Sequence, residues 1–114
     1  MTLMELKQKK INNLVVVYLT GKLDIHFSEE IEKELFRLIN EESASNLLLN
    51  LKNVEYMSSS GIRIFVSTMR TLRESKRKLY LCEMSSAVMK IFEIVELLSM
   101  FEIFETEEEA LKAL

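Results

Sequence analysis

The chain has 114 residues, of which 48% are hydrophobic and 29% are charged. This composition predicts a globular protein, because disordered chains carry too few apolar side chains to form a core. The 15 basic and 18 acidic residues give a net charge of −3. That balance argues against nucleic-acid binding, which usually needs a strongly basic face. The length is typical of one domain, and we expect residues 1–114 to form a single domain.

Three further classes of protein are disfavoured by the residue types present. Cys82 is the only cysteine, so an intramolecular disulfide is impossible, and its apolar neighbours predict a buried thiol. His26 is the only histidine, which excludes a multi-histidine metal site. No stretch is long and apolar enough to span a bilayer, and the N-terminal residues do not resemble a signal peptide. We therefore expect a cytoplasmic protein with no metal, no other cofactor and no membrane partner.

The first predicted elements form a β-hairpin. Residues 4–10 are a weak strand candidate, Asn12 and Asn13 are typical of a turn, and residues 14–19 are rich in β-branched side chains. Two strands so close in sequence are most simply antiparallel neighbours. We expect the chain to leave the sheet over residues 20–24.

The next predicted elements are a helix and a buried strand. Ser28 is a suitable N-cap, and the acidic residues directly after it favour the first turn of a helix. This helix should bury an apolar stripe with helical spacing, formed by Ile31, Leu35, Leu38 and Ile39. Residues 46–51 are short and leucine-rich, which fits a buried strand. We expect residues 52–60 to form the loop that follows.

The second half of the chain continues the alternation of helices and strands. An apolar stripe beyond Gly61 predicts a second helix, and residues 78–82 predict another strand. Ser85 is the expected cap of a third helix, residues 101–104 are a strand candidate, and Thr106 opens a final helix through a capping box. The expected buried stripes of these three helices are Ile62, Phe65, Val66, Met69 and Leu72, then Val88, Ile91, Phe92, Val95 and Leu98, and last Ala110, Leu111 and Leu114.

The expected order of elements is β-β-α-β-α-β-α-β-α, which indicates an α/β fold. Alternating strands and helices imply parallel neighbours joined by right-handed crossovers, and the hairpin adds one antiparallel strand. We expect a mixed, mostly parallel sheet of about five strands with about four helices.

A basic cluster lies where the second helix should end. It consists of Arg70, Arg73 and residues 76–78. Cations favour a helix C-terminus because they complement the helix dipole. The alternative is a small surface that contacts an anionic partner.

The strongest candidate for a functional element is the serine-rich segment at the start of the second helix. Ser58, Ser59 and Ser60 precede Gly61, at a turn from a strand into a helix, where functional groups of α/β sheets usually lie. One serine is enough to cap the helix. Three hydroxyls also favour phosphorylation, because the N–H groups and positive dipole of a helix N-terminus tolerate a phosphate. The residues by themselves do not separate these two interpretations.

Motifs for nucleotide binding and nucleophilic catalysis are missing. Two isolated glycines cannot build a phosphate-binding loop or a dinucleotide fingerprint, and the serine segment lacks the first glycine of a Gly-x-Ser-x-Gly elbow. Ser59, His26 and Asp24 have the residue types of a catalytic triad, but nothing beyond residue type indicates one. We therefore predict a protein that binds other proteins and is not an enzyme.

Three segments resemble a known family. Residues 48–62, which read Leu-Leu-Asn-Leu-Lys-Asn-Val-Glu-Tyr-Met-Ser-Ser-Ser-Gly-Ile, resemble the signature of the STAS domains of anti-sigma factor antagonists. In that family an apolar strand leads into Asp-Ser-Ser/Thr-Gly-Leu/Ile. Residues 19–24 resemble the Gly-x-Leu/Ile-Asp that follows the family's second strand, and residues 101–111 resemble its last strand and helix. The resemblance covers nearly the whole chain and implies a STAS-like domain.

The resemblance also implies a role in bacterial partner switching. Such an antagonist, when unphosphorylated, binds an anti-sigma factor that is also a serine kinase, and this binding frees a sigma factor for transcription. The kinase phosphorylates a serine of the antagonist, which switches the binding off, and a serine phosphatase restores it. By position that serine is Ser59, with Ser58 and Ser60 as less favoured acceptors.

The partner-binding surface implied by the resemblance surrounds this serine. Gly61 would let a partner backbone come close, because it has no side chain. The residues carried over to this surface are Asp24, Ser58, Ser59, Ser60, Gly61, Ile62 and Arg63. Ser58 departs from the family pattern, because it stands where the family has an aspartate and cannot supply that charge. The alternative that this departure leaves open is a STAS interaction, scaffold or sensor module without a working phosphorylation switch.

Overall fold

The structure is a computed structural model that describes residues 6–41 and 45–114, apart from the side chains of residues 25–27. The strands are β1 (Lys7–Ile11), β2 (Leu14–Leu23), β3 (Asn46–Met57), β4 (Leu79–Cys82) and β5 (Glu102–Phe104). The helices are α1 (Ile25–Glu41), α2 (Ser59–Glu74), α3 (Ser86–Ile94) and α4 (Glu107–Ala113), and a short 3₁₀ helix, η1, spans Leu98–Met100. The predicted α/β class and the predicted order of elements are confirmed.

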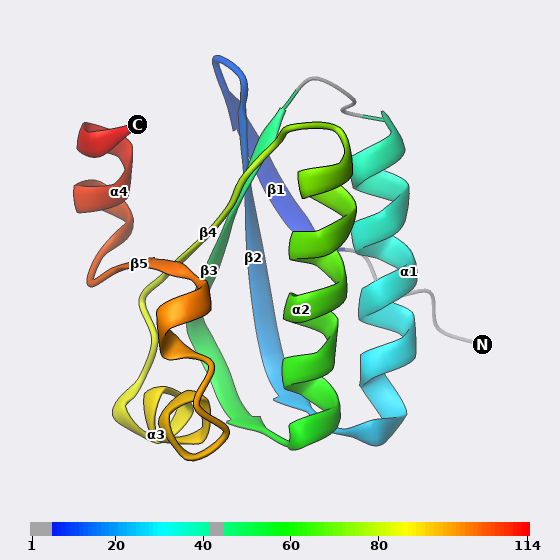
Figure 1. Cartoon of the computed structure of the whole chain (residues 1–114), viewed down its shortest axis with the longest axis vertical. Coiled ribbons are helices and arrows are strands. Elements are labelled where there is room, and N and C mark those ends of the chain that lie inside the picture. The colour runs from blue at the N-terminus through cyan, green and yellow to red at the C-terminus, as the bar shows by residue number, and fades with distance from the viewer. Residues whose placement is uncertain (1–5, 42–44) are drawn as a thin grey trace.

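The five strands form one mixed sheet in the order β1-β2-β3-β4-β5. β1 is antiparallel to β2, and the other neighbours are parallel, as the alternation of strands and helices predicts. Figure 1 shows α1 and α2 side by side against one face of this sheet. α4 lies at the other side, where Ala110 packs on the second face of the strands. Within the described part of the chain, no helix is long and apolar enough to cross a membrane.

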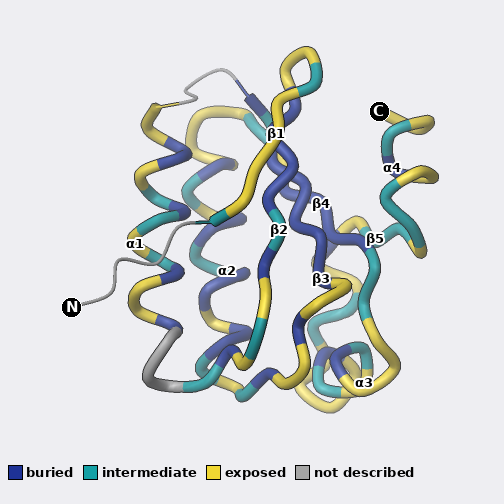
Figure 2. The backbone as a smooth tube through the Cα atoms, turned by 180° about the vertical axis from the view of Figure 1, so that it is seen from behind, coloured by how far each residue is buried: buried dark blue, intermediate teal, exposed yellow. Residues whose placement is uncertain are grey.

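Both faces of the central strands are buried, which explains their continuous apolar runs. Val15 and Val17 point to the side of α1 and α2, whereas Val16 and Leu48 point to the side of α4. Figure 2 shows the middle of the sheet as the most buried part of the backbone, with exposed positions on the outer sides of α1 and α2. Cys82 is fully buried, as predicted, and this burial raises the pKa of its thiol to about 12.

β2 and β3 are both longer than predicted. The expected exit from the sheet over residues 20–24 and the expected loop over residues 52–60 are wrong, because the two strands stay paired up to the register pair Leu23 and Met57. The register shifts twice along this stretch, between Tyr18 and Thr20 and after Gly21. Such irregularities break the period of two by which strands are recognised in a sequence.

The helix boundaries also differ from the prediction at three places. α1 begins at Ile25, before Ser28, and the buried Ser28 hydroxyl donates a hydrogen bond to the carbonyl oxygen of Asp24 at 2.5 Å. Ser28 therefore bonds back to the preceding turn and is not the N-cap. α2 includes Ser59, so it begins ahead of Gly61. α3 ends at Ile94, so Val95 is exposed and does not continue a buried stripe.

The predicted serine and threonine caps of the last two helices are confirmed. The Ser85 hydroxyl accepts a hydrogen bond from the N–H of Val88 at 3.2 Å, and the Thr106 hydroxyl accepts one from the N–H of Glu109 at 3.1 Å. Each satisfies a helix donor that would otherwise lack a partner. Of the residues expected to dock α4, Ala110 is buried and Leu111 half-buried, but Leu114 is exposed.

A polar cluster of Lys9, Tyr18, Asn50 and Glu107 joins α4 to the sheet, and the sequence did not reveal it. The carboxylate of Glu107 lies 2.9 Å from the ammonium of Lys9 and accepts a hydrogen bond from the amide of Asn50 at 3.0 Å. Burial raises the pKa of Glu107, but hydrogen bonds from Lys9, Asn50 and Tyr18 outweigh this effect and lower it below the ordinary 4.5. The charged form of Glu107 therefore stabilises the docked helix.

We predict that Glu107→Gln destabilises the protein at neutral pH by about 1 kcal/mol, because it removes the charge-assisted bonds to Lys9 and Asn50. The folded-state pKa of Glu107 is lowered, so its contribution is present above the unfolded-state pKa and is lost as the pH falls through the folded-state pKa. Urea unfolding of both proteins between pH 7 and about pH 3 should show the difference shrinking towards acid.

Glu108→Gln is the matched control on the same helix. Glu108 pairs only with the exposed Lys112 among the described residues, so we expect its loss to change the unfolding free energy by less than about 0.5 kcal/mol. A Glu107→Gln effect that is absent at pH 7, or that does not depend on pH, would contradict the assigned role of the carboxylate.

Candidate functional site

The serine-rich segment forms the junction between β3 and α2, and Ser58 is its anchor. Ser58 has an extended backbone (φ −92°, ψ 173°) and is the N-cap of α2. Its hydroxyl accepts a hydrogen bond from the N–H of Gly61 at 3.3 Å and donates one to the carbonyl oxygen of Leu23 at 3.2 Å. The N–H of Ser58 donates to the same carbonyl oxygen at 3.0 Å. Ser58 therefore ties the start of α2 to the end of β2.

The structure places Asp24 next to this junction. Leu23 and Met57 are register partners at the carboxyl ends of the parallel strands β2 and β3. Asp24 and Ser58 directly follow this pair, so they leave the sheet at the same edge. Figure 1 shows the starts of α1 and α2 close together at this edge.

The three serines differ in exposure. Ser59 is exposed and is the first residue of α2, whereas Ser58 and Ser60 are half-buried. The first turn of α2 carries no acidic residue, so no carboxylate of its own offsets the positive end of the helix dipole there. An anionic group attached to Ser59 would therefore lie in a favourable field while facing the solvent.

Two residues expected at the partner-binding surface are in the core. Ile62 is 3% exposed and belongs to the apolar core between the sheet and the helices. Gly61 is also buried, and a Cβ atom on it would lie 2.7 Å from the carbonyl oxygen of Leu23 and 2.9 Å from Cγ of Met57. The packing of α2 on β2 and β3 therefore needs a glycine here, because a side chain at this position would point into the domain and not towards a partner.

The exposed surface beside Ser59 includes residues that the sequence did not single out. Tyr56, the second-to-last residue of β3, is 52% exposed, and its register partner on β2, Lys22, is exposed as well. Arg63 is exposed on the first turns of α2, as expected for a surface residue. An exposed aromatic ring is a common anchor of protein–protein interfaces. The signal in the sequence was a tyrosine two residues before the serines, but the prediction of a loop there missed that Tyr56 belongs to a paired strand.

The site offers no evidence of a metal centre in the described part of the chain, where no group of three or more His, Cys, Asp and Glu side chains could hold an ion. The side chain of His26 lies outside the described residues, so the triad considered with Ser59 and Asp24 has no described geometry. What the described residues offer is an exposed hydroxyl at a helix N-terminus, beside the strand end that carries the exposed Tyr56.

We predict that Gly61→Ala destabilises the fold by about 2 kcal/mol, because the new methyl group must displace the backbone at Leu23. Ser59→Ala, at an exposed position of the same turn, should change the unfolding free energy by less than about 0.5 kcal/mol. Urea unfolding of the two variants beside the wild type measures both values. Equal stability of Gly61→Ala and wild type would show that the contact with Leu23 does not require a glycine.

Comparison with known proteins agrees with this geometry. Residues 5–110 match the STAS domain family. The chain is 30% identical to BtrV of Bordetella bronchiseptica over 110 residues, 96% of this chain and 94% of BtrV. It is 31% identical to the anti-sigma-B factor antagonist of Staphylococcus aureus over 88 residues, 77% of this chain and 81% of that protein.

Solved structures show the same relationship. The anti-sigma factor antagonist SpoIIAA in its unphosphorylated form superimposes with a TM-score of 0.80 at 26% identity, covering 96% of this chain and 95% of SpoIIAA. The phosphorylated form of the Bacillus protein SpoIIAA superimposes with a TM-score of 0.71 at 25% identity, covering 96% of this chain and 98% of SpoIIAA. From the sheet order, the serine junction and these similarities together, the chain belongs to the STAS domain family.

Proposed function

We propose that this protein is an anti-sigma factor antagonist whose binding is switched off by phosphorylation of Ser59. In its unphosphorylated form it binds an anti-sigma factor that is also a serine kinase, in the cytoplasm, and so regulates transcription by a sigma factor. A serine phosphatase restores the binding form. The proposal describes a binding protein and not an enzyme, and it requires no cofactor.

The observation that carries the proposal is the difference between Ser59 and its neighbours. Ser58 uses its hydroxyl to hold Leu23 and Gly61, so its phosphorylation would remove the N-cap of α2. Ser59 is exposed, and no described contact of α2 depends on its hydroxyl. A kinase can therefore modify Ser59 without unfolding the helix.

A phosphate on Ser59 would act on the partner and not on the fold. It adds close to two negative charges and strong hydrogen-bond acceptors. The positive end of α2 favours this charge, so the domain stays folded. A partner that covers Ser59 would instead have to bury a strongly hydrated dianion, which costs binding free energy. The two solved forms of SpoIIAA support this view, because both the unphosphorylated and the phosphorylated form superimpose on this chain.

The surface of the proposed interface combines the serines with Asp24, Tyr56 and Arg63. Tyr56 supplies an exposed aromatic side chain, and Asp24 and Arg63 supply opposite charges at the same edge of the molecule. Aromatic residues and arginine are the residues that most often dominate the energy of such interfaces. This surface is held in place by residues inside the domain: the hydrogen-bonded Ser58 and the buried Gly61 and Ile62.

The second candidate function is a STAS interaction, scaffold or sensor module without a phosphorylation switch. The observation that favours it is Ser58, which stands where the family resemblance places an aspartate. Serine and aspartate cap a helix about equally well, so the capping role of this position is preserved. Only the negative charge beside the phosphoacceptor is lost, and a kinase that needs this charge would not modify Ser59.

We predict that a cognate anti-sigma kinase with ATP adds one phosphate to the wild-type protein and none to Ser59→Ala. Intact-mass spectrometry of both proteins measures the modification. Ser60→Ala is the control, because it removes the neighbouring half-buried hydroxyl and should still accept one phosphate. A phosphate on Ser59→Ala would place the modification elsewhere, and an unmodified wild type would favour the module without a switch.

We also predict that Ser59→Asp keeps the melting temperature of the wild type and binds the anti-sigma factor at least about tenfold more weakly, because its charge is favoured by the helix and unfavourable in the interface. Isothermal titration calorimetry and thermal melts measure the two properties. Ser59→Asn has nearly the same size without the charge and should retain most of the affinity. If Ser59→Asp bound as tightly as Ser59→Asn, charge would not be the basis of the switch.

A further inference from the structure

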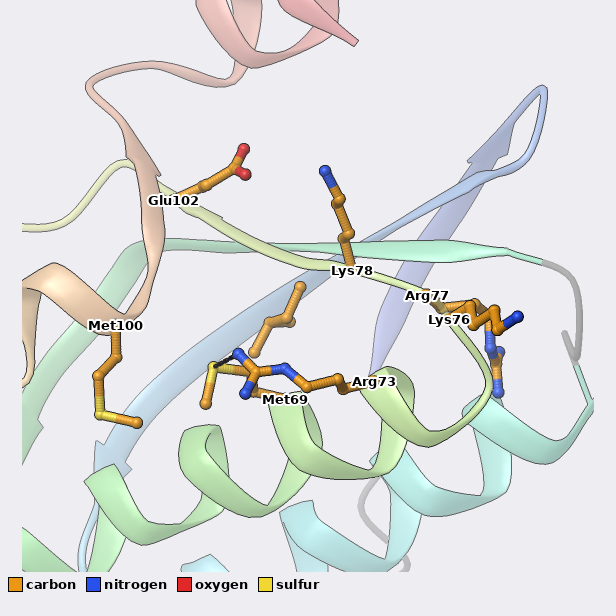
Figure 3. Close-up of a pocket in the computed structure, with 8 residues that line it drawn as sticks. Met69, Arg73, Lys76, Arg77, Lys78, Met100 and Glu102 are labelled. Atoms are coloured by element: carbon orange, nitrogen blue, oxygen red, sulfur yellow. Dashed lines mark hydrogen bonds between the residues drawn. The ribbon is translucent and has the colours of Figure 1, made fainter.

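A second feature lies at the other end of α2 from Ser59. A cavity of about 380 Å³ opens between the end of α2, the start of β4 and the segment before β5. Figure 3 shows Met69 and Arg73 of α2, Met100 of η1 and the basic residues ahead of β4 around it. Its volume is within the range of sites for small molecules. Arg73 is about 20 Å along the helix axis from Ser59, so the two sites are separate.

The cavity lies next to the part of β4 that β5 does not reach. β5 begins at Glu102, which is the register partner of Tyr80, so Leu79 is paired with Leu47 of β3 on one side and with no residue of β5 on the other. The apolar part of its lining consists of Met69, Leu79 and Met100. Methionine side chains are flexible and polarisable and adapt to ligands of different shape. The cavity therefore has an adaptable apolar wall.

The rim of the cavity is cationic in a protein whose net charge is −3. It includes Arg73, Lys76 and Lys78, and none of these three forms an ion pair with any residue that the structure describes. The guanidinium of Arg73 lies over the apolar wall, with Nη2 3.9 Å from Sδ of Met69. A cation held against a thioether, with no carboxylate partner among the described residues, provides a binding point for an anion.

The remaining charged residues of the rim do not compete for this anion. Arg77 donates hydrogen bonds to the carbonyl oxygens of Ile39 at 3.1 Å and Ser45 at 3.3 Å, so it ties α1 to the start of β4. Glu102 is the register partner of Tyr80 and therefore lies, like Tyr80, on the α4 side of the sheet. Leu79 and Met69 belong to the core on the opposite side, next to α1 and α2. Figure 3 likewise shows Lys78 and Glu102 projecting from the opposite side of β4 from Arg73.

The end of α2 explains part of this basic cluster but not the cavity. The N–H of Lys76 donates to the carbonyl oxygen of Arg73 at 3.0 Å, and the N–H of Arg77 donates to that of Leu72 at 2.8 Å. These two bonds form a Schellman motif, in which Lys76 occupies the left-handed position (φ 60°) that glycine usually takes. A lysine there costs about 1 kcal/mol relative to glycine, so helix termination alone does not favour it.

We propose that this cavity binds a small amphipathic anion, a carboxylate or phosphate group carried on a medium-length alkyl chain. The alkyl chain packs against Met69, Leu79 and Met100, and Arg73 binds the anionic group. Lys76 adds positive charge at the rim, whereas Lys78, like Glu102, projects from the other side of β4. The apolar wall and the guanidinium of Arg73 line the same cavity, so a ligand with both an alkyl chain and an anionic group should bind more tightly than a ligand with only one of them.

The proposal is tested with four probes and the isotope-labelled full chain. Octanoate and octyl phosphate carry both features, octanol lacks the charge, and acetate lacks the chain. We expect saturable amide chemical-shift changes around Met69, Arg73, Leu79 and Met100 with octanoate or octyl phosphate, and binding at least about tenfold weaker with octanol and acetate. The tighter of the two anions identifies the head group. Octanol binding as tightly as both anions, or shift changes outside the cavity, would overturn the proposal.

Variants separate binding from folding. Arg73→Gln should weaken binding of the better probe about tenfold, because it removes a charge-assisted hydrogen bond. Arg70→Gln is the control, since Arg70 is exposed on the same helix and does not line the cavity. Lys76→Gly should weaken binding severalfold and leave the melting temperature equal or higher, because glycine suits the left-handed position. Unchanged binding by Arg73→Gln would refute the assignment.

Discussion

The structure depends most on the parallel pairing of β2 with β3. Both strands continue to the register pair Leu23 and Met57, and the ends of the two strands determine where α1 and α2 begin. The carbonyl oxygen of Leu23 accepts hydrogen bonds from both the N–H and the hydroxyl of Ser58. Because Gly61 has no side chain, α2 can pack closely against the same residue, Leu23. The geometry of the proposed phosphoacceptor is therefore set by one backbone carbonyl at the end of a neighbouring strand.

This arrangement separates stability from recognition within a few residues. Ser58, Gly61 and Ile62 face inward and hold the junction, whereas Ser59 faces the solvent. A change of charge at an exposed helix N-terminus costs the fold little, because the helix dipole favours an anion there. The same change costs a partner the burial of a hydrated charge. A switch at Ser59 can therefore alter binding in a domain that remains folded.

The two ends of α2 are suited to different ligands. The positive end of the helix dipole, at its N-terminus, favours an attached anion, and the negative end, at its C-terminus, favours the cations found there. The N-terminal turn has no acid and presents hydroxyls, while the C-terminal end carries cations beside an apolar cavity. On the other face of the sheet, α4 is held by a small apolar cluster and by the buried part of Glu107, whose bonds to Lys9 and Asn50 reach two different strands. Polar or charged groups thus mark three separate regions around one apolar sheet.

The sequence by itself determined the α/β class, the order of the elements, the buried stripes of α1 and most of α2, and the caps at Ser85 and Thr106, because apolar spacing and capping depend on neighbouring residues. It also indicated the serine segment and Asp24 through the STAS resemblance. Only the tertiary structure decided the length of β2 and β3, the inward role of Gly61, the exposure of Tyr56 and the contacts of Glu107. Each of these depends on residues distant in sequence. The register shifts between β2 and β3 interrupt the alternation of buried and exposed residues by which strands are recognised. Leu23, Lys9 and Asn50 reach their partners only when the sheet has formed.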